Sequence, residues 1–235
     1  MAIRLNKYIA ESGLCSRRNA EKYILEGRVT INNKTVTDLS YKINEENDEV
    51  FVDGEKIKPK RHIYILLNKP KGVITSTKDE KNRKTVVDLV KTNEKIYPVG
   101  RLDYNTTGVL LLTNDGDFSN LLTHPKHKIR KTYTVQLNKP LMNEDENKLL
   151  KGVYINRRKG IFIKINFPNI KKKTLVEVAV VEGRNHFIKD MFSTLGYNVV
   201  ELDRKYFGQF EADIPLGKYR VISNEEIKSV YKNYN

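Results

Sequence analysis

The chain has 235 residues, a formal net charge of +14 at neutral pH and a single cysteine, Cys15. This length fits one large or two modest domains, and the lone cysteine excludes an internal disulfide or a cysteine metal cluster. No apolar run approaches a membrane span and the N-terminus lacks a signal-peptide core, so we expect a cytoplasmic protein without membrane association whose excess positive charge favours a polyanionic partner.

The first 60 residues are predicted to form two helices followed by short strands. Apolar side chains with helical spacing precede Ser12-Gly13, and Ser16 is a suitable N-cap for a second helix over residues 17–26. Residues 28–36 alternate around an Asn-Asn turn and predict a hairpin, and a further hairpin is expected at Asp53-Gly54. Basic side chains dominate the first half of this segment and acidic side chains the second half, which is typical of a module with one face toward nucleic acid.

Three strings in this segment resemble the S4 RNA-binding module: Arg4-Leu5-Asn6-Lys7-Tyr8, Ser16-Arg17-Arg18-Asn19-Ala20-Glu21 and Glu26-Gly27-Arg28-Val29-Thr30-Ile31-Asn32. The resemblance implies that residues 1–60 are an RNA-binding domain. Taken singly, each basic residue would be interpreted as a solvated surface charge; together they fit phosphate binding on an RNA helix or loop. The residues that we assign to RNA binding here are Arg4, Lys7, Arg17, Arg18 and Arg28.

A polar linker at residues 56–61 leads into a second domain, residues 61–235. A strand over 62–68, a turn at 69–72 and a return along 73–76 are predicted first. Further strands are expected at 108–113, 130–137, 161–167, 174–181, 198–203 and 218–222, and helices at 117–123, capped by Asp117, and at 186–195. Strands and helices without a strict alternation predict an α+β fold.

A polar loop between Val99 and an apolar run carries a carboxylate, in the string Gly100-Arg101-Leu102-Asp103-Tyr104-Asn105-Thr106-Thr107-Gly108. A carboxylate at the mouth of a buried strand is a common way to hold a nucleophile on a rigid scaffold. An isolated Asp in such a loop would be interpreted as a turn residue, as Asp115 is. The complete string closely resembles the catalytic motif of pseudouridine synthases of the RsuA family, in which the Asp at this position is essential.

This resemblance implies a mixed, largely antiparallel sheet with flanking helices, and an enzyme that isomerises a uridine. The N1–C1′ bond breaks, the base turns over and rejoins through C5, after the nucleotide has been flipped out of the RNA stack. The reaction needs an ionised carboxylate, a wall for the uracil ring and a cation beside the carboxylate. It needs no cofactor, and the four histidines lack the spacing of a metal site, so we expect neither metal nor cofactor.

The string Lys131-Thr132-Tyr133-Thr134-Val135 alternates as a strand, which places Lys131 and Tyr133 on one face. A tyrosine in a strand is by default an ordinary cross-strand aromatic. The family carries a Tyr in this context, stacked on the target base, and the resemblance assigns that role to Tyr133.

The segment from Glu182 to Phe192 has apolar residues at i,i+4 spacing and predicts an amphipathic core helix. The resemblance also places Ile188 against the active-site tyrosine and Lys189 against the catalytic carboxylate, where a cation would keep that carboxylate ionised. The sequence departs from the family's usual pattern at Phe187, where the family often has Gln, and at Asp190, where it often has a second basic residue.

We further assign Leu102 to the active-site wall and Arg184 to RNA binding. Arg101 has two equally weighted roles, a structural ion pair or insertion where the flipped uridine leaves the stack. A catalytically silent RNA-binding protein on the same fold is the alternative, and Asp103, Tyr133 and Lys189 argue against it; an enzyme acting on transfer RNA is a weaker one.

The expected partner is ribosomal RNA, and we expect a monomer. Three strings look more like the large-subunit (RluB-like) branch of the family than the small-subunit branch: Tyr64 to Gly72, Tyr97 to Gly100 and Leu122 to Pro125. Loops beside the carboxylate would touch the nucleotides that flank the flipped base. The sequence therefore predicts a large-subunit uridine as the target.

Overall fold

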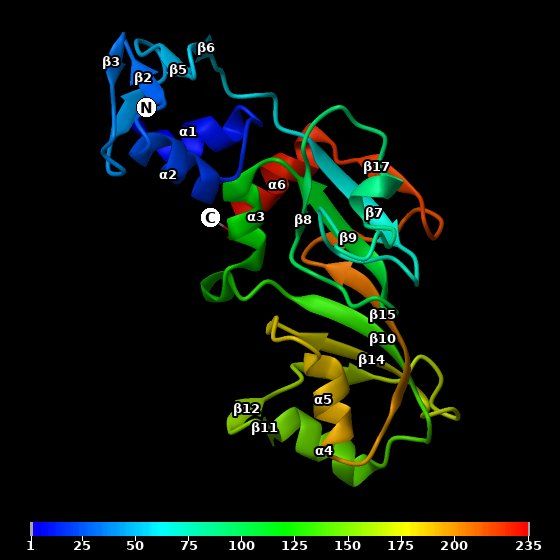
Figure 1. The fold of residues 1–235 in the computed structure, drawn as a ribbon. Coiled ribbons are helices and arrows are strands. Elements are labelled where there is room, and N and C mark those ends of the chain that lie inside the picture. The colour runs from blue at the N-terminus through cyan, green and yellow to red at the C-terminus, as the bar shows by residue number, and fades with distance from the viewer. Residues whose placement is uncertain (1, 235) are drawn as a thin grey trace. The chain divides into compact units, whose positions relative to one another are not determined.

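The computed structural model describes residues 2–234. The chain divides into two compact units. One runs to His62 and includes Asn93–Lys95, and the other takes Ile63–Thr92 and the chain from Ile96 onward. The first unit is the blue end of the ribbon in Figure 1. Across residues 2–234, no helix is long and apolar enough to cross a membrane.

The first unit packs helices α1 (Leu5–Glu11) and α2 (Arg17–Leu25) against short strands around one apolar core. The Ser16 hydroxyl accepts a hydrogen bond from the Asn19 N–H and caps α2 as predicted. Both predicted hairpins are confirmed, but the antiparallel pair β1–β4 was not predicted. The strands are β1 (Ala2–Arg4), β2 (Val29–Ile31), β3 (Lys34–Thr35), β4 (Lys42–Asn44), β5 (Val50–Val52) and β6 (Glu55–Lys56).

The second unit is built on a mixed sheet in the order β13-β14-β10-β15-β9-β7-β17, with β16 on β15 and β8 on β9. Among the described strands of this sheet, β15 and β9 run parallel and the other pairs are antiparallel. The predicted α+β class with a largely antiparallel sheet is therefore confirmed. The strands are β7 (Tyr64–Lys69), β8 (Tyr97–Val99), β9 (Thr107–Thr113), β10 (Lys131–Leu137), β13 (Lys164–Asn166), β14 (Leu175–Val180), β15 (Val199–Phe207), β16 (Phe210–Glu211) and β17 (Tyr219–Val221).

Strand β9 is the apolar run that follows the catalytic-motif string, and all of it is buried. Successive side chains of a strand point to opposite faces. Val109 and Leu111 accordingly pack with helices α3 (Gly116–Thr123) and α6 (Asn224–Tyr234). Leu110 and Leu112 belong to the larger cluster with α4 (Asn143–Lys151) and α5 (Phe187–Ser193). Both faces of the sheet are therefore covered, as Figure 1 shows. The remaining elements are the 3-10 helices η1 (Val87–Leu89) and η2 (Pro125–His127) and the hairpin β11 (Val153–Ile155) and β12 (Arg158–Gly160).

Several sequence expectations were wrong. Residues 73–76 do not return as a strand beside β7, because β9 and β17 occupy its two edges. Asp115, and not Asp117, caps α3, since its carboxylate accepts hydrogen bonds from the N–H groups of Asp117 and Phe118. Helices α4 and α6 were missed because each buries a single side chain, Leu149 or Val230, which leaves a weak apolar period.

Candidate active site

Asp103 lies in the loop between β8 and β9, with its side chain 25% exposed. The Lys189 Nζ on α5 donates to Asp103 Oδ2 at 2.6 Å. The structure thus brings together two groups 86 residues apart in the chain, as the sequence predicts. On the other side of the carboxylate, the His186 Nε2 lies 3.6 Å from Oδ1.

The position of His186 was not predicted. It precedes α5 with a φ of 53°, in the left-handed region that a side chain other than glycine seldom adopts. Backbone strain of this kind often accompanies functional sites. A histidine next to an amphipathic helix is not a strong enough pattern to reveal such a contact.

A second unpredicted residue, Lys69 at the end of β7, holds the loop that carries Asp103. Its ammonium group is fully buried. It donates to the carbonyl oxygens of Pro70, Asp103, Tyr104 and Thr106 at 3.0–3.3 Å. Burial lowers the pKa of Lys69 to about 8, against the opposing effect of the Asp103 charge. Four carbonyl dipoles replace the water shell of the ammonium and fix the backbone of the loop.

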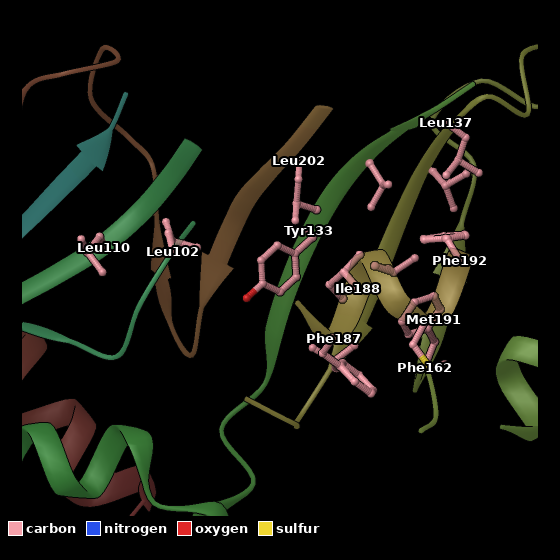
Figure 2. Packing of buried hydrophobic residues seen from close by; sticks show 14 of the residues in the cluster. Leu102, Leu110, Tyr133, Leu137, Phe162, Phe187, Ile188, Met191, Phe192 and Leu202 are labelled. Atoms are coloured by element: carbon pink, nitrogen blue, oxygen red, sulfur yellow. The ribbon is translucent and has the colours of Figure 1, made fainter. Parts of the chain in front are cut away.

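The wall of the site comes from three separate elements. Tyr133 on β10, Ile188 on α5 and Leu102 in the loop are all buried and belong to one apolar cluster. In Figure 2 the Tyr133 ring lies between Leu102 on one side and Ile188 on the other. These residues line a cavity of about 320 Å³ together with Asp103 and Lys189. That volume is within the range of pockets that take small molecules.

Arg101 and Arg184, which the sequence analysis assigns to RNA binding, also line this cavity. Arg101 is exposed. Arg184 is held in place: its Nε lies 2.6 Å from Glu182 Oε2, its Nη2 donates to the Lys159 carbonyl at 3.1 Å, and its guanidinium covers the Phe187 ring. Arg184 therefore packs against the start of α5.

The structure distinguishes among the basic residues of the first unit. Arg4, Arg17 and Arg18 are exposed. Lys7 lies 3.5 Å from Glu11. Arg28 donates two hydrogen bonds to Asp53 and one to Glu26, so its charge is already compensated within the fold. Arg17 and Arg18 fit a phosphate contact better than Arg28.

Comparison with known proteins gives the same picture. The model of the RNA pseudouridylate synthase family matches residues 63–194, and that of the S4 domain matches residues 3–50. The chain is 39% identical to the ribosomal large subunit pseudouridine synthase B of Bacillus subtilis, over 96% of this chain and 94% of that protein. It is 34% identical to the ribosomal small subunit pseudouridine synthase A of Escherichia coli, over 97% of this chain and all of that protein.

A crystal structure of a pseudouridylate synthase superposes with a TM-score of 0.70 at 32% identity, covering 97% of this chain and 99% of that one. The fold and the paired carboxylate beside a buried tyrosine thus define an RNA-modifying enzyme with an S4 domain. The chain belongs to the RNA pseudouridylate synthase family.

Proposed function

We propose that this protein converts a uridine of ribosomal RNA to pseudouridine in the cytoplasm, with residues 1–60 binding RNA and residues 61–235 performing the reaction. The observation that carries the proposal is the 2.6 Å pair between Asp103 and Lys189 at the edge of a cavity walled by Tyr133. Relatives named as ribosomal pseudouridine synthases support ribosomal RNA as the substrate.

Each side chain at the cavity has a role in this reaction. The Lys189 ammonium offsets the negative charge of the Asp103 carboxylate and orients it toward the sugar and base. The Tyr133 ring offers a face on which the flipped uracil stacks, and Ile188 and Leu102 exclude water from the base. Arg101 is exposed at the cavity, where it can enter the space that the flipped nucleotide leaves in the RNA.

We further propose that the target lies in large-subunit RNA. The large-subunit enzyme of Bacillus subtilis is 39% identical to this chain, against 34% for the small-subunit enzyme of Escherichia coli. The loop residues around Lys69 and Gly100 that resemble the large-subunit branch flank the Asp103 loop, where they would meet nucleotides beside the flipped uridine.

The test measures tritium release from unmodified large- and small-subunit ribosomal RNA, each containing 5-tritiated uridine. We expect the purified protein to release tritium from the large-subunit RNA. Asp103→Asn should abolish release while it binds the RNA as the wild type does, because the substitution keeps the size of the side chain and removes its charge. Asp190→Asn changes a carboxylate next to Lys189 on α5 that does not touch the pair; it is the matched control and should stay active.

Three other results of this experiment would each contradict a different part of the proposal. Release from small-subunit RNA alone would contradict the large-subunit target and leave the reaction standing. Wild-type release by Asp103→Asn would refute the catalytic role of this carboxylate. Tight binding without release by the wild type would indicate the silent RNA-binding alternative.

A further inference from the structure

Two buried cations line the cavity beside Asp103, and neither has an acidic partner among residues 2–234. Lys131 on β10 is 9% exposed and Arg204 on β15 is 2% exposed, and both line the cavity. The Arg204 Nε donates to the Val109 carbonyl at 2.7 Å, while its buried Nη2 has no hydrogen-bond partner within residues 2–234. The Lys131 Nζ makes a long 3.4 Å hydrogen bond to the Ile129 carbonyl.

The acidic side chains at this cavity are already engaged. Asp103 pairs with Lys189, and Glu182 pairs with Arg184. Across the described chain, neither Lys131 nor Arg204 forms an ion pair with a carboxylate.

A β-bulge creates this arrangement. In the β10–β15 pair, Thr132 lies opposite Tyr206 but Tyr133 lies opposite Arg204, so Lys205 is the extra residue. Bulges re-aim side chains and occur often beside active sites. Here the bulge places Arg204 opposite Tyr133, with its guanidinium 4.7 Å from the Phe207 ring centroid.

The Lys131 ammonium lies 5.5 Å from the same Phe207 ring. Two cations therefore lie near one aromatic ring, and both are shielded from solvent. Buried charges in proteins are ordinarily paired, because the loss of water is otherwise uncompensated. The pKa of Lys131 falls to about 8, mainly because of burial and secondly because of the Arg204 charge. Such a pair costs stability until an anion arrives from outside the chain.

We propose that Lys131, with Arg204 behind it, binds the uracil oxygen on which negative charge develops when the N1–C1′ bond breaks. The inference rests on the proposed function and adds a residue to its chemistry. The electron pair of the broken bond stays on the base and spreads to its O2 and O4. The new bond from C5 to C1′ is formed with an electron pair of the base. C5 then loses its proton and N1 gains one, so the reaction needs no co-reactant.

The geometry favours a base oxygen over a backbone phosphate. Lys131 and Tyr133 share one strand face, about 7 Å apart at two residues' rise. A uracil stacked on Tyr133 would thus bring one edge to the Lys131 ammonium. The phosphodiester of a flipped nucleotide stays with the RNA chain at the mouth of the pocket, away from the buried Lys131 ammonium.

The experiment compares Lys131→Met and Lys131→Arg in the full-length protein, with Lys205→Met as control. Lys205 lies on β15, the strand that pairs with the β10 strand of Lys131. Unlike Lys131, its Nζ is paired with Glu177 at 2.6 Å. The readouts are the single-turnover rate at saturating RNA, Kd, the salt dependence of Kd and the pH profile. Thermal unfolding checks that each variant is folded.

We expect Lys131→Met to lower the saturated rate about 100-fold, the effect of removing one preorganised donor to a developing oxyanion. Its Kd and salt dependence should match those of the wild type. The wild-type rate should fall above pH 8 as the ammonium loses its proton. Lys131→Arg should keep most of the rate and lose this alkaline fall, because Arg stays charged. Lys205→Met should behave as the wild type. His186, the histidine that lines the cavity, is unchanged in all variants.

Two results would overturn the inference. A wild-type saturated rate in Lys131→Met, with a weaker Kd and a salt slope reduced by about 0.7–0.9, would show a phosphate contact. An unchanged rate with unchanged Kd would show that Lys131 takes no part. Either result leaves the proposed function intact so long as Asp103→Asn is inactive, so the two failures are distinguishable.

Discussion

Two lysines of the catalytic unit are equally unusual as buried cations but differ in how they are compensated. Lys69 and Lys131 both have a pKa of about 8 because burial disfavours the ammonium form. Lys69 donates to four carbonyl oxygens, of which those of Asp103 and Tyr104 also accept from backbone N–H groups. Within the described part of the chain, the Lys131 ammonium makes one long hydrogen bond, to the Ile129 carbonyl. Lys69 is therefore part of the architecture, whereas Lys131 costs the folded protein stability.

This difference predicts that Lys131→Met is more stable than the wild type at pH 7, by on the order of 2 kcal/mol. The folded pKa of Lys131 lies below the ordinary value of 10.5, so between about pH 8 and 10.5 the unfolded chain binds more protons than the folded one. The free energy of unfolding of the wild type should therefore rise, through the titration of Lys131, as the pH rises through that window. The advantage of Lys131→Met should be full below pH 8 and vanish toward pH 10.5.

Urea unfolding of wild type and Lys131→Met at several pH values from 7 to 10.5 measures the effect. The difference between the two proteins cancels the titration of Lys69 and of other groups. Equal stability at pH 7 would mean that Lys131 is better solvated than its burial indicates.

At the level of elements, the pairing of β9 with β15 depends on Gly108. These strands run parallel, and a Cβ on Gly108 would lie 2.3 Å from the Arg204 carbonyl oxygen, with a φ of +103°. This glycine closes the string that carries Asp103, and its strand partner, Arg204, is in the cation pair. The close approach of the two backbones thus ties the catalytic loop to the cation pair.

Gly108→Ala should destabilise the protein by about 3 kcal/mol, because the backbone of β15 must move and a left-handed φ is strained for alanine. Gly217→Ala is the matched control in the same unit. It has a positive φ of +79°, but a Cβ there would meet Pro70 at an ordinary 3.9 Å. We expect about 1 kcal/mol from Gly217→Ala, measured by urea unfolding. Equal losses in both variants would mean that backbone conformation, and not crowding, explains the glycine at 108.

At the level of the whole molecule, the sequence assigns RNA anchoring to the first unit and chemistry to the second. Substituting Arg17 and Arg18 together by Ala should weaken RNA binding and lower the log–log salt slope by about 1.4, since each lost contact to a single strand removes about 0.7. The saturated rate should stay unchanged, because neither residue lies at the catalytic cavity.

Arg28→Ala is the structural control for this prediction. The Arg28 charge is compensated by Asp53 and Glu26, so its removal should leave the salt slope nearly unchanged. Binding titrations of the full-length variants between about 50 and 200 mM salt make the comparison. An Arg28→Ala slope as low as that of the double variant would show that Arg28 leaves Asp53 for RNA.

The sequence by itself determined those features of this protein that depend on residues close together in the chain. The S4 strings, the Asp103 loop and the strand and helix patterns around Tyr133 and Lys189 are local, because a turn, a cap or a strand period involves residues only a few positions apart. The α+β class and the approach of Lys189 to Asp103 could therefore be predicted, the latter from the order of motifs that the family shares.

Only the tertiary structure decided what depends on strand register and long-range packing. The bulge at Lys205 places Arg204 opposite Tyr133, a residue 71 positions earlier, and no local pattern signals it. The same holds for Lys69, whose role follows from carbonyl groups more than 30 residues away. Helices α4 and α6 form because neighbouring elements cover their one buried position. Strand register and the compensation of buried charges depend on contacts between residues far apart in the chain, and those contacts exist only in the folded protein.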